Sequence, residues 1–163
     1  MNMKLRKLLT KDAQWMLEWM HDDDTVRYFK ENFSDKSISD CLAFIDASSD
    51  ETQNVHMAIV NDSDEYMGTV SLKHIHDHTA EFAIVLRKCA RGKGYASFGM
   101  REILKYGFTE KGIDSVYWCV DPNNLRAVRF YEKHNAERSD APEYASGYAE
   151  EEKETYIWYR MVR

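Results

Sequence analysis

The sequence contains little that would divide the chain or anchor it. Its 163 residues include two prolines, Pro122 and Pro142, and show no repeat or linker-like tract. We therefore expect a single domain over residues 1–163, built around one core. No apolar run approaches the length of a membrane span, and the opening MNMKLRKLLTKD lacks a signal-type apolar stretch. These features predict a soluble, cytoplasmic protein without a membrane partner.

Cysteine and positive charge are also in short supply. Cys41, Cys89 and Cys119 are odd in number and have no C-x-x-C spacing, which argues against a disulfide framework or a cysteine zinc site. We expect them to be reduced core residues. Acidic residues outnumber basic ones 28 to 22, for a net charge of −6, and no long basic stripe is present. This balance argues against nucleic acid as the main partner.

What the chain does have is a clear succession of strand and helix patterns. Thr10 is a candidate N-cap for the first helix, and Ser37 with Asp40 forms a capping pair before the second. Between the third helix and the next strand, Gly112 is a stop signal. The expected strands are 4–8, 55–60, 65–75, 80–86, 115–120 and 155–162; the expected helices are 11–20, 38–47, 96–111 and 125–134; residues 137–154 are expected to form a charged loop. The order β-α-α-β-β-β-α-β-α-β predicts an α+β fold with a mixed sheet.

Two glycines mark the junction between the 80–86 strand and the following helix. The segment Arg91-Gly92-Lys93-Gly94-Tyr95-Ala96 lets the backbone approach a ligand, and amides at a helix start favour an anion. It is not a nucleotide-binding P-loop, because no Ser or Thr follows Lys93. It is not G-x-G-x-x-G either, because the third glycine is missing. The pattern indicates a phosphate site, with an ordinary loop before a helix as the alternative.

The same segment resembles the R/Q-x-x-G-x-G/A signature of the GNAT superfamily of acetyl-CoA-dependent N-acetyltransferases, with Arg91, Gly94 and Ala96 in the matching positions. DPNNLRAVRFYEK resembles the superfamily's second motif, and AEFAIVL resembles its strand before the phosphate loop. The opening KLRKLLTKDAQWMLEW is similar to the ribosomal-protein and small-amine branches. The resemblance implies a GNAT-like domain, in which a mixed central sheet carries helices on both faces. One departure is EKHNAE, where Asn135 and Ala136 replace the usual Gly-Phe; Asn135 can adopt the left-handed turn.

The resemblance also implies where acetyl-CoA would bind. The pantetheine arm would follow the main chain of Ile84, Val85 and Leu86, which are also expected to be buried strand residues. The pyrophosphate would lie on the amides of residues 91–96, namely Arg91, Gly92, Lys93, Gly94, Tyr95 and Ala96. Asn124 resembles a cofactor-contacting asparagine, although after Asp-Pro-Asn it may equally cap the next helix. No metal is expected.

Two residues are candidates for the proton transfers of acetyl transfer to an amine. Tyr131 matches the family's tyrosine beside the sulfur, and a phenol can donate a proton to a departing thiolate. Its alternative role is core packing. Glu81 is the leading candidate for the base, acting through water, and its alternative is a surface carboxylate at the strand edge with solvent as the base.

His74, His76 and His78 alternate and would share one face of an extended strand. A metal site is one interpretation, but no carboxylate or cysteine completes a known ligand spacing, and a predicted turn breaks the alternation. We expect a solvent-facing hairpin here. His74 is a second candidate for proton relay.

The acceptor site of relatives is shaped by two segments, which correspond here to Asp22–Phe33 and Ala141–Glu154. Both are acidic and aromatic, which suits a cationic amine, although acidic loops are commonly just solvated surface. The leading hypothesis is an enzyme that moves the acetyl group of acetyl-CoA to a primary amine on a small molecule such as a polyamine or an aminosugar. The alternatives are acetylation of a protein N-terminus or lysine, and a non-catalytic acyl-CoA sensor. A homodimer is left open.

Overall fold

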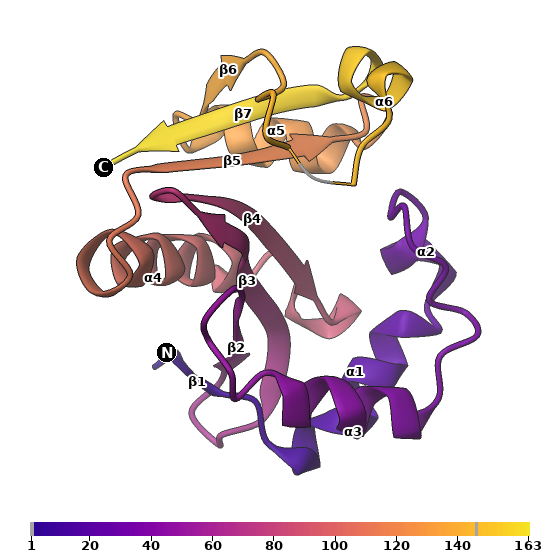
Figure 1. The fold of residues 1–163 in the computed structure, drawn as a ribbon. Coiled ribbons are helices and arrows are strands. Elements are labelled where there is room, and N and C mark those ends of the chain that lie inside the picture. The colour runs from indigo at the N-terminus through magenta and orange to yellow at the C-terminus, as the bar shows by residue number, and fades with distance from the viewer. Residues whose placement is uncertain (1, 146) are drawn as a thin grey trace.

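The computed structural model of the protein describes residues 2–145 and 147–163. Within them, seven strands form one mixed sheet (Figure 1). The strands are β1 (Lys4–Lys7), β2 (Val55–Val60), β3 (Tyr66–His76), β4 (Thr79–Leu86), β5 (Ser115–Val120), β6 (Glu137–Ser139) and β7 (Ile157–Val162). Their order is β1-β2-β3-β4-β5-β7-β6, and β4 with β5 is a parallel pair among antiparallel neighbours. The predicted α+β fold with a mixed sheet is confirmed.

Helices cover both faces of the sheet, as the resemblance implied (Figure 1). On one face lie α1 (Ala13–Met20) and α3 (Ile38–Ala47), and on the other lie α4 (Tyr95–Glu110) and α5 (Leu125–Lys133). Two short helices, α2 (Asp23–Val26) and α6 (Glu150–Thr155), follow α1 and precede β7. In the described part of the chain, no helix is both long and apolar enough to cross a bilayer.

Apolar side chains of the sheet alternate between two packed layers. One layer joins the sheet to α4 and α5, and the other joins it to α1 and α3, where Cys41 is fully buried. Cys119 is half-buried. Cys89 is exposed, so its expected place in the core is wrong. The reason is local: Cys89 lies in the 3-10 turn Lys88–Ala90 that leaves the sheet after β4, where only Ala90 points inward.

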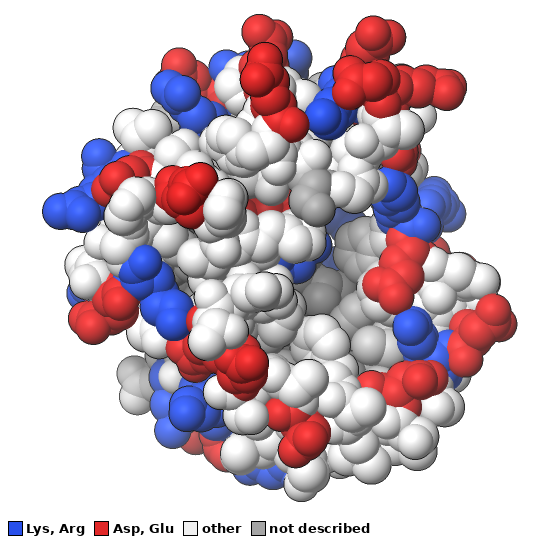
Figure 2. Space-filling view, viewed as in Figure 1, with Lys and Arg blue, Asp and Glu red and all other residues white. Residues whose placement is uncertain are grey.

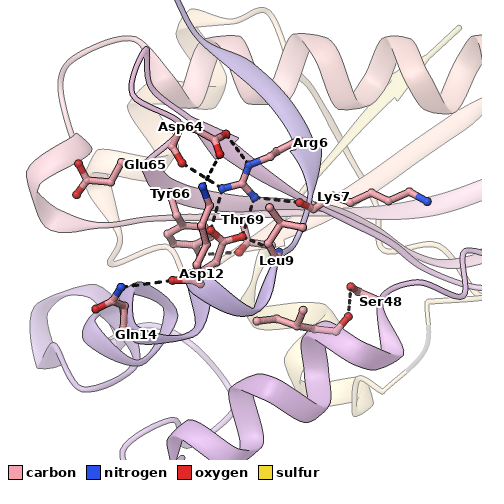
Figure 3. Close-up of polar contacts among 12 residues, drawn as sticks. Arg6, Lys7, Leu9, Asp12, Gln14, Ser48, Asp64, Glu65, Tyr66 and Thr69 are labelled. Atoms are coloured by element: carbon pink, nitrogen blue, oxygen red, sulfur yellow. Dashed lines mark hydrogen bonds and ion pairs between the residues drawn. The ribbon is translucent and has the colours of Figure 1, made fainter.

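The start of α1 differs from the expected cap at Thr10. Thr10 instead begins a 3-10 turn, Thr10–Asp12, and Asp12 is the N-cap residue of α1. The buried Asp12 carboxylate accepts hydrogen bonds from the Leu9 amide at 2.8 Å and from the Arg6 guanidinium at 2.8 and 2.9 Å (Figure 3). Arg6 also binds Asp64 at 2.8 Å, so this cluster fixes the chain between β1 and α1. The second cap is as predicted, because Ser37 and Asp40 form a capping box at α3.

The segment expected as a charged loop, residues 137–154, contains β6 and all of α6 except its last residue, Thr155. β6 pairs antiparallel with β7 through Glu137–Ser139, and a three-residue edge strand shows no usable alternation in the sequence. α6 has three glutamates in its first turn, where the helix dipole favours negative charge. Its charged sequence lacks the apolar periodicity from which a helix is predicted.

Two predictions of backbone conformation are confirmed. Asp77 and His78 have φ values of 47° and 65°, so a tight turn breaks the His74-His76-His78 alternation. Asn135 has a φ of 60°, which is the left-handed conformation expected where relatives carry glycine. Ala136 beside it is 8% exposed and packs in the core, so a small residue fills this position.

Candidate active site

The sheet opens at the parallel pair of β4 and β5. These strands pair only at Thr79–Glu81 with Ser115–Tyr117, whereas β4 stays paired with β3 as far as Leu86. Beyond Glu81, the two strands diverge, as Figure 1 shows. The edge of β4 that carries Ile84, Val85 and Leu86 therefore faces an opening rather than a neighbouring strand. Such an edge offers main-chain groups to an extended ligand.

The predicted phosphate loop lies in the connection between β4 and α4, directly before α4. Gly92 and Gly94 have φ values of 72° and 90°, a conformation that side-chain-bearing residues rarely adopt. Gly94 is the N-cap of the 16-residue helix α4, and no side chain caps it. The first-turn amides of a helix have no acceptor within the helix. This start of α4 can therefore receive a pyrophosphate on amides and on the helix dipole, and the residues present fit the group that the sequence pattern predicts.

The side chains of this loop take different directions. Lys93 is exposed, Ala96 is half-buried, and Tyr95 is 4% exposed, so the Tyr95 ring is a core group and only its main chain can serve a ligand. Arg91 reaches away from the helix start. Its guanidinium pairs with Asp24 at 2.7 Å and donates to the Thr25 hydroxyl at 2.7 Å, which lowers the pKa of Asp24. Arg91 thus ties the loop to α2, which lies in the first of the two segments predicted to shape an acceptor site.

A pocket of about 420 Å³ adjoins the start of α4. Its lining includes Gly94 together with residues of the chain's N-terminal end and of the first two turns of α4, namely Asn2, Met3, Ser97, Phe98 and Arg101. The Ser97 hydroxyl is hydrogen-bonded to His134 Nε2 at 2.7 Å, which links α4 to the end of α5. The pocket gives a bulky phosphate-bearing ligand room beside the loop.

Tyr131 lies on the α5 side of the sheet, beside the opening. Its ring packs among four aromatic rings, with centroids 5.2 Å from Trp118, 5.4 Å from Tyr159, 5.2 Å from Phe130 and 6.3 Å from Phe82. The packing role is therefore real. Yet none of the described residues hydrogen-bonds to its hydroxyl, and burial raises the pKa of the phenol, so the hydroxyl keeps a proton to donate.

Asn124 is the N-cap of α5. Its side-chain oxygen accepts a hydrogen bond from the Ala127 amide at 3.3 Å. Of the two roles expected for Asn124, the structure shows the cap. Cofactor contact stays a prediction.

Glu81 is buried at the apex of the opening, on the last residue of β4 that pairs with β5. It is 3% exposed, so the alternative of a surface carboxylate is wrong. One carboxylate oxygen contacts His74 Nδ1 at 3.0 Å and Lys73 Nζ at 3.8 Å, and the other accepts a hydrogen bond from the Tyr148 hydroxyl at 2.6 Å. The carboxylate lies on the sheet face opposite Tyr131, because side chains alternate along β4 between Glu81 and the ring-contacting Phe82.

Tyr148 is the residue that sequence reasoning missed. Burial and the Glu81 carboxylate raise the pKa of its phenol, which therefore donates to Glu81. Burial also raises the pKa of the neighbouring Cys119 thiol to about 11. The tyrosines of the 141–154 segment were expected only as cover for an acceptor. Nothing in their spacing indicated which one would return to β4.

The two segments predicted to shape an acceptor site contact each other beside Glu81, to which Tyr148 is hydrogen-bonded. Lys30, which follows α2, contacts the Gly147 carbonyl, pairs with Glu152 Oε1 at 2.8 Å and lies 5.0 Å from the Tyr148 ring centroid. Figure 2 shows acidic side chains over α6 and a hollow between α6 and α2 on this face. Glu152 and Tyr148 of one segment thus meet Lys30 of the other, and the acceptor-binding role of the two segments stays a prediction.

Comparison with known proteins places these features in a family. Residues 2–137 match the family model described as the acetyltransferase (GNAT) domain. The uncharacterized N-acetyltransferase YnaD of Bacillus subtilis is 28% identical over 130 residues, which cover 79% of this chain and 75% of YnaD. The spermidine N(1)-acetyltransferase of Escherichia coli is 28% identical over 141 residues, covering 81% of this chain and 71% of that protein.

A solved structure agrees with the fold over nearly the whole chain. The spermidine N-acetyltransferase of Vibrio cholerae, in complex with CoA and spermine, superposes with a TM-score of 0.78 at 20% sequence identity. The match covers 99% of this chain and 94% of that one.

Proposed function

The chain belongs to the GNAT family of acetyltransferases and is an N-acetyltransferase, and from that premise we propose that it acetylates a primary amine of a small polyamine-like molecule, with acetyl-CoA as the donor. The observation that carries the proposal is the opening between β4 and β5, which has a helix start suited to phosphate at its end and a buried carboxylate at its apex. This geometry would bring an anionic acetyl donor next to a carboxylate that can accept a proton from an amine.

Main-chain groups, rather than particular side chains, would hold the donor acetyl-CoA. The amides of the Arg91–Ala96 loop and the α4 dipole suit the pyrophosphate, and the open β4 edge at Ile84–Leu86 suits the amides of the pantetheine arm. When bound, acetyl-CoA supplies the acetyl group as an activated thioester. Arg91 would support this site indirectly by holding α2 against the loop through Asp24.

Glu81 and Tyr131 would handle the protons from opposite sides of the sheet. A primary amine is mostly protonated at neutral pH, since a lysine-like group has a reference pKa of about 10.4, so nucleophilic attack requires a base. The Glu81 carboxylate would accept that proton through water, and the exposed edge of His74 gives the proton a way to solvent. The Tyr131 hydroxyl, unpartnered among the described residues, would donate its proton to the departing sulfur.

The acceptor assignment rests on charge and on relatives. Spermidine N-acetyltransferases are among the relatives and the structural neighbours, and acidic side chains lie over α6 beside the hollow that Figure 2 shows. The Tyr148 ring lies between Lys30 and Glu81. Carboxylates attract a polycation and rings cover its methylene groups. The second candidate is a protein N-terminus or lysine, which the same Glu81 chemistry would serve.

A thiol-release assay with acetyl-CoA tests the proposal. The panel should contain spermidine, 1,4-diaminobutane, an aminosugar, a lysine peptide and a peptide with a free N-terminus. We expect turnover with the small amines and little with the peptides. Turnover confined to peptides would transfer the proposal to protein acetylation, and acetyl-CoA binding without any turnover would leave a sensor.

A further inference from the structure

The ammonium group of Lys30 occupies a site that any primary ammonium could fill. Its three partners are the Gly147 carbonyl, the Glu152 carboxylate at 2.8 Å and the face of the Tyr148 ring at 5.0 Å. A carbonyl, a carboxylate and an aromatic face together form a recognition set for R-NH3+. The three partners come from one segment, residues 147–152, whereas Lys30 arrives from the distant segment after α2.

This ammonium site is joined directly to the proposed base. The Tyr148 ring covers Lys30 on its face, while the hydroxyl of the same ring donates to Glu81 Oε2 at 2.6 Å. One tyrosine side chain therefore separates the carboxylate that would deprotonate an amine from a site that already holds an ammonium. A linear diamine has two nitrogens on a flexible stem, so one can approach Glu81 while the other fills the ammonium site. A monoamine can occupy only one of these two positions.

We propose that Glu152, the Gly147 carbonyl and Tyr148 bind the distal ammonium of a di- or polyamine acceptor, and that Lys30 occupies this site as an internal competitor until the acceptor displaces it. The inference rests on the proposed function and specifies how the same site selects its substrate. The hydrogen bond from Lys30 lowers the pKa of Glu152, so the carboxylate is ionised and ready for either ammonium.

Lys30 is placed to be displaced. Its side chain is 50% exposed, and the Glu152 side chain is 26% exposed, so water can take over both groups during exchange. While Lys30 occupies the site, the acceptor cannot bind there. The apparent affinity for the acceptor is therefore its intrinsic affinity multiplied by the fraction of molecules in which the site is open. An exposed ion pair together with a cation–π contact corresponds to roughly a three- to thirty-fold effect.

Calorimetric binding to the CoA-loaded protein tests the proposal, with 1,4-diaminobutane and the matched monoamine butylamine as probes. Lys30→Met removes the competing ammonium and keeps an apolar stem. It should tighten diamine binding by about three- to thirty-fold and tighten butylamine binding less, because butylamine can occupy only one of the two places. Glu152→Gln, added to Lys30→Met, should reverse the gain. Glu150→Gln is the matched control, because this 89% exposed carboxylate of α6 lies outside the ammonium site and should leave the diamine-to-monoamine ratio as in the wild type.

Two outcomes would overturn the proposal. If Lys30→Met weakens the binding of both amines alike, Lys30 only stabilises the conformation of the 147–152 segment. Lys30→Arg, which keeps a cation, then restores wild-type binding. If a folded Lys30→Met protein binds the diamine with unchanged affinity, Lys30 does not compete. Failure of the proposed function looks different, because the wild type would then bind neither amine while still binding CoA.

Discussion

The Tyr131 ring packs against four aromatic rings, but its hydroxyl has no hydrogen-bond partner in the described part of the chain. A phenol retained for packing alone would work equally well as phenylalanine. We therefore expect Tyr131→Phe to lower kcat by about 10²-fold, as for loss of a general acid, with CoA affinity nearly unchanged. Single-turnover kinetics and calorimetry measure the two quantities. Tyr159→Phe, in the same ring cluster, should keep the rate; equal rates for all three proteins would leave Tyr131 as a packing residue.

Glu81 allows a sharper test through pH. If its carboxylate accepts the amine's proton, the wild type keeps activity at lower pH than Glu81→Gln, whose rate depends on free amine or hydroxide. The deficit of Glu81→Gln should then shrink as the pH rises toward the pKa of the amine. Log-rate profiles from about pH 6 to 10 measure this, a range that spans the approach to the reference amine value. Parallel profiles with equal CoA affinity would exclude Glu81 as the base.

At the scale of elements, the start of α4 depends on the conformation of Gly94. Its φ of 90° is strained for other residues, and an acidic side chain there would also repel a pyrophosphate. We expect Gly94→Glu to abolish CoA binding in a protein that still folds, measured by calorimetry and circular dichroism. Unchanged affinity would remove the phosphate site from this loop.

The open edge of β4 depends on a second glycine, on the neighbouring strand. A Cβ on Gly68 would come within 2.4 Å of the Val85 carbonyl oxygen and 2.7 Å of a Leu86 methyl carbon. Gly68→Ala must therefore shift β4, at a cost of about 1–3 kcal/mol, and should weaken CoA binding as well. Gly107→Ala is the control. Its Cβ meets mainly the end of the Leu72 side chain, away from the opening, so CoA affinity should stay constant. Equal CoA affinity in both variants would mean that the Val85 region does not hold the cofactor.

At the scale of the whole molecule, His56 makes the free energy of unfolding depend on pH. Burial, with a smaller contribution from Lys73, lowers the pKa of His56 to about 4, while Nδ1 contacts the Ser71 hydroxyl at 2.6 Å. In the unfolded chain the imidazole has a pKa of about 6.5, so the unfolded state binds more protons than the folded state between about pH 4 and this value. Stability is therefore full above about pH 6.5 and falls as the pH drops toward 4, by up to about 3 kcal/mol.

Urea unfolding from pH 7.5 to 4.5 measures this loss. His56→Gln has no titrating imidazole and should show a shallower decline than the wild type. The same decline in both proteins would assign the acid sensitivity to other groups.

Much of this protein was determined by the sequence, because the decisive signals are local. Apolar periodicity fixed most strands and helices, and the left-handed turns at Asn135 and at the 77–78 hairpin follow from residues that tolerate a positive φ. The glycine turn before α4 could be located for the same reason, since two glycines before a helix act through the backbone, and its phosphate-binding role is a proposal. Ser37 and Asp40 likewise form their capping box within four residues.

Only the tertiary structure decided the contacts between distant segments. The Glu81 carboxylate is hydrogen-bonded to Tyr148, 67 positions away, and the ammonium of Lys30 is paired with Glu152, 122 positions away. β6 and α6 have no apolar periodicity from which they could be predicted, because pairing with β7 stabilises the short edge strand and the helix dipole stabilises the glutamate-rich turn. The position of Arg91 against Asp24 is of the same kind. Side-chain partners across a fold are set by how the sheet twists and splits, and no local pattern encodes that geometry.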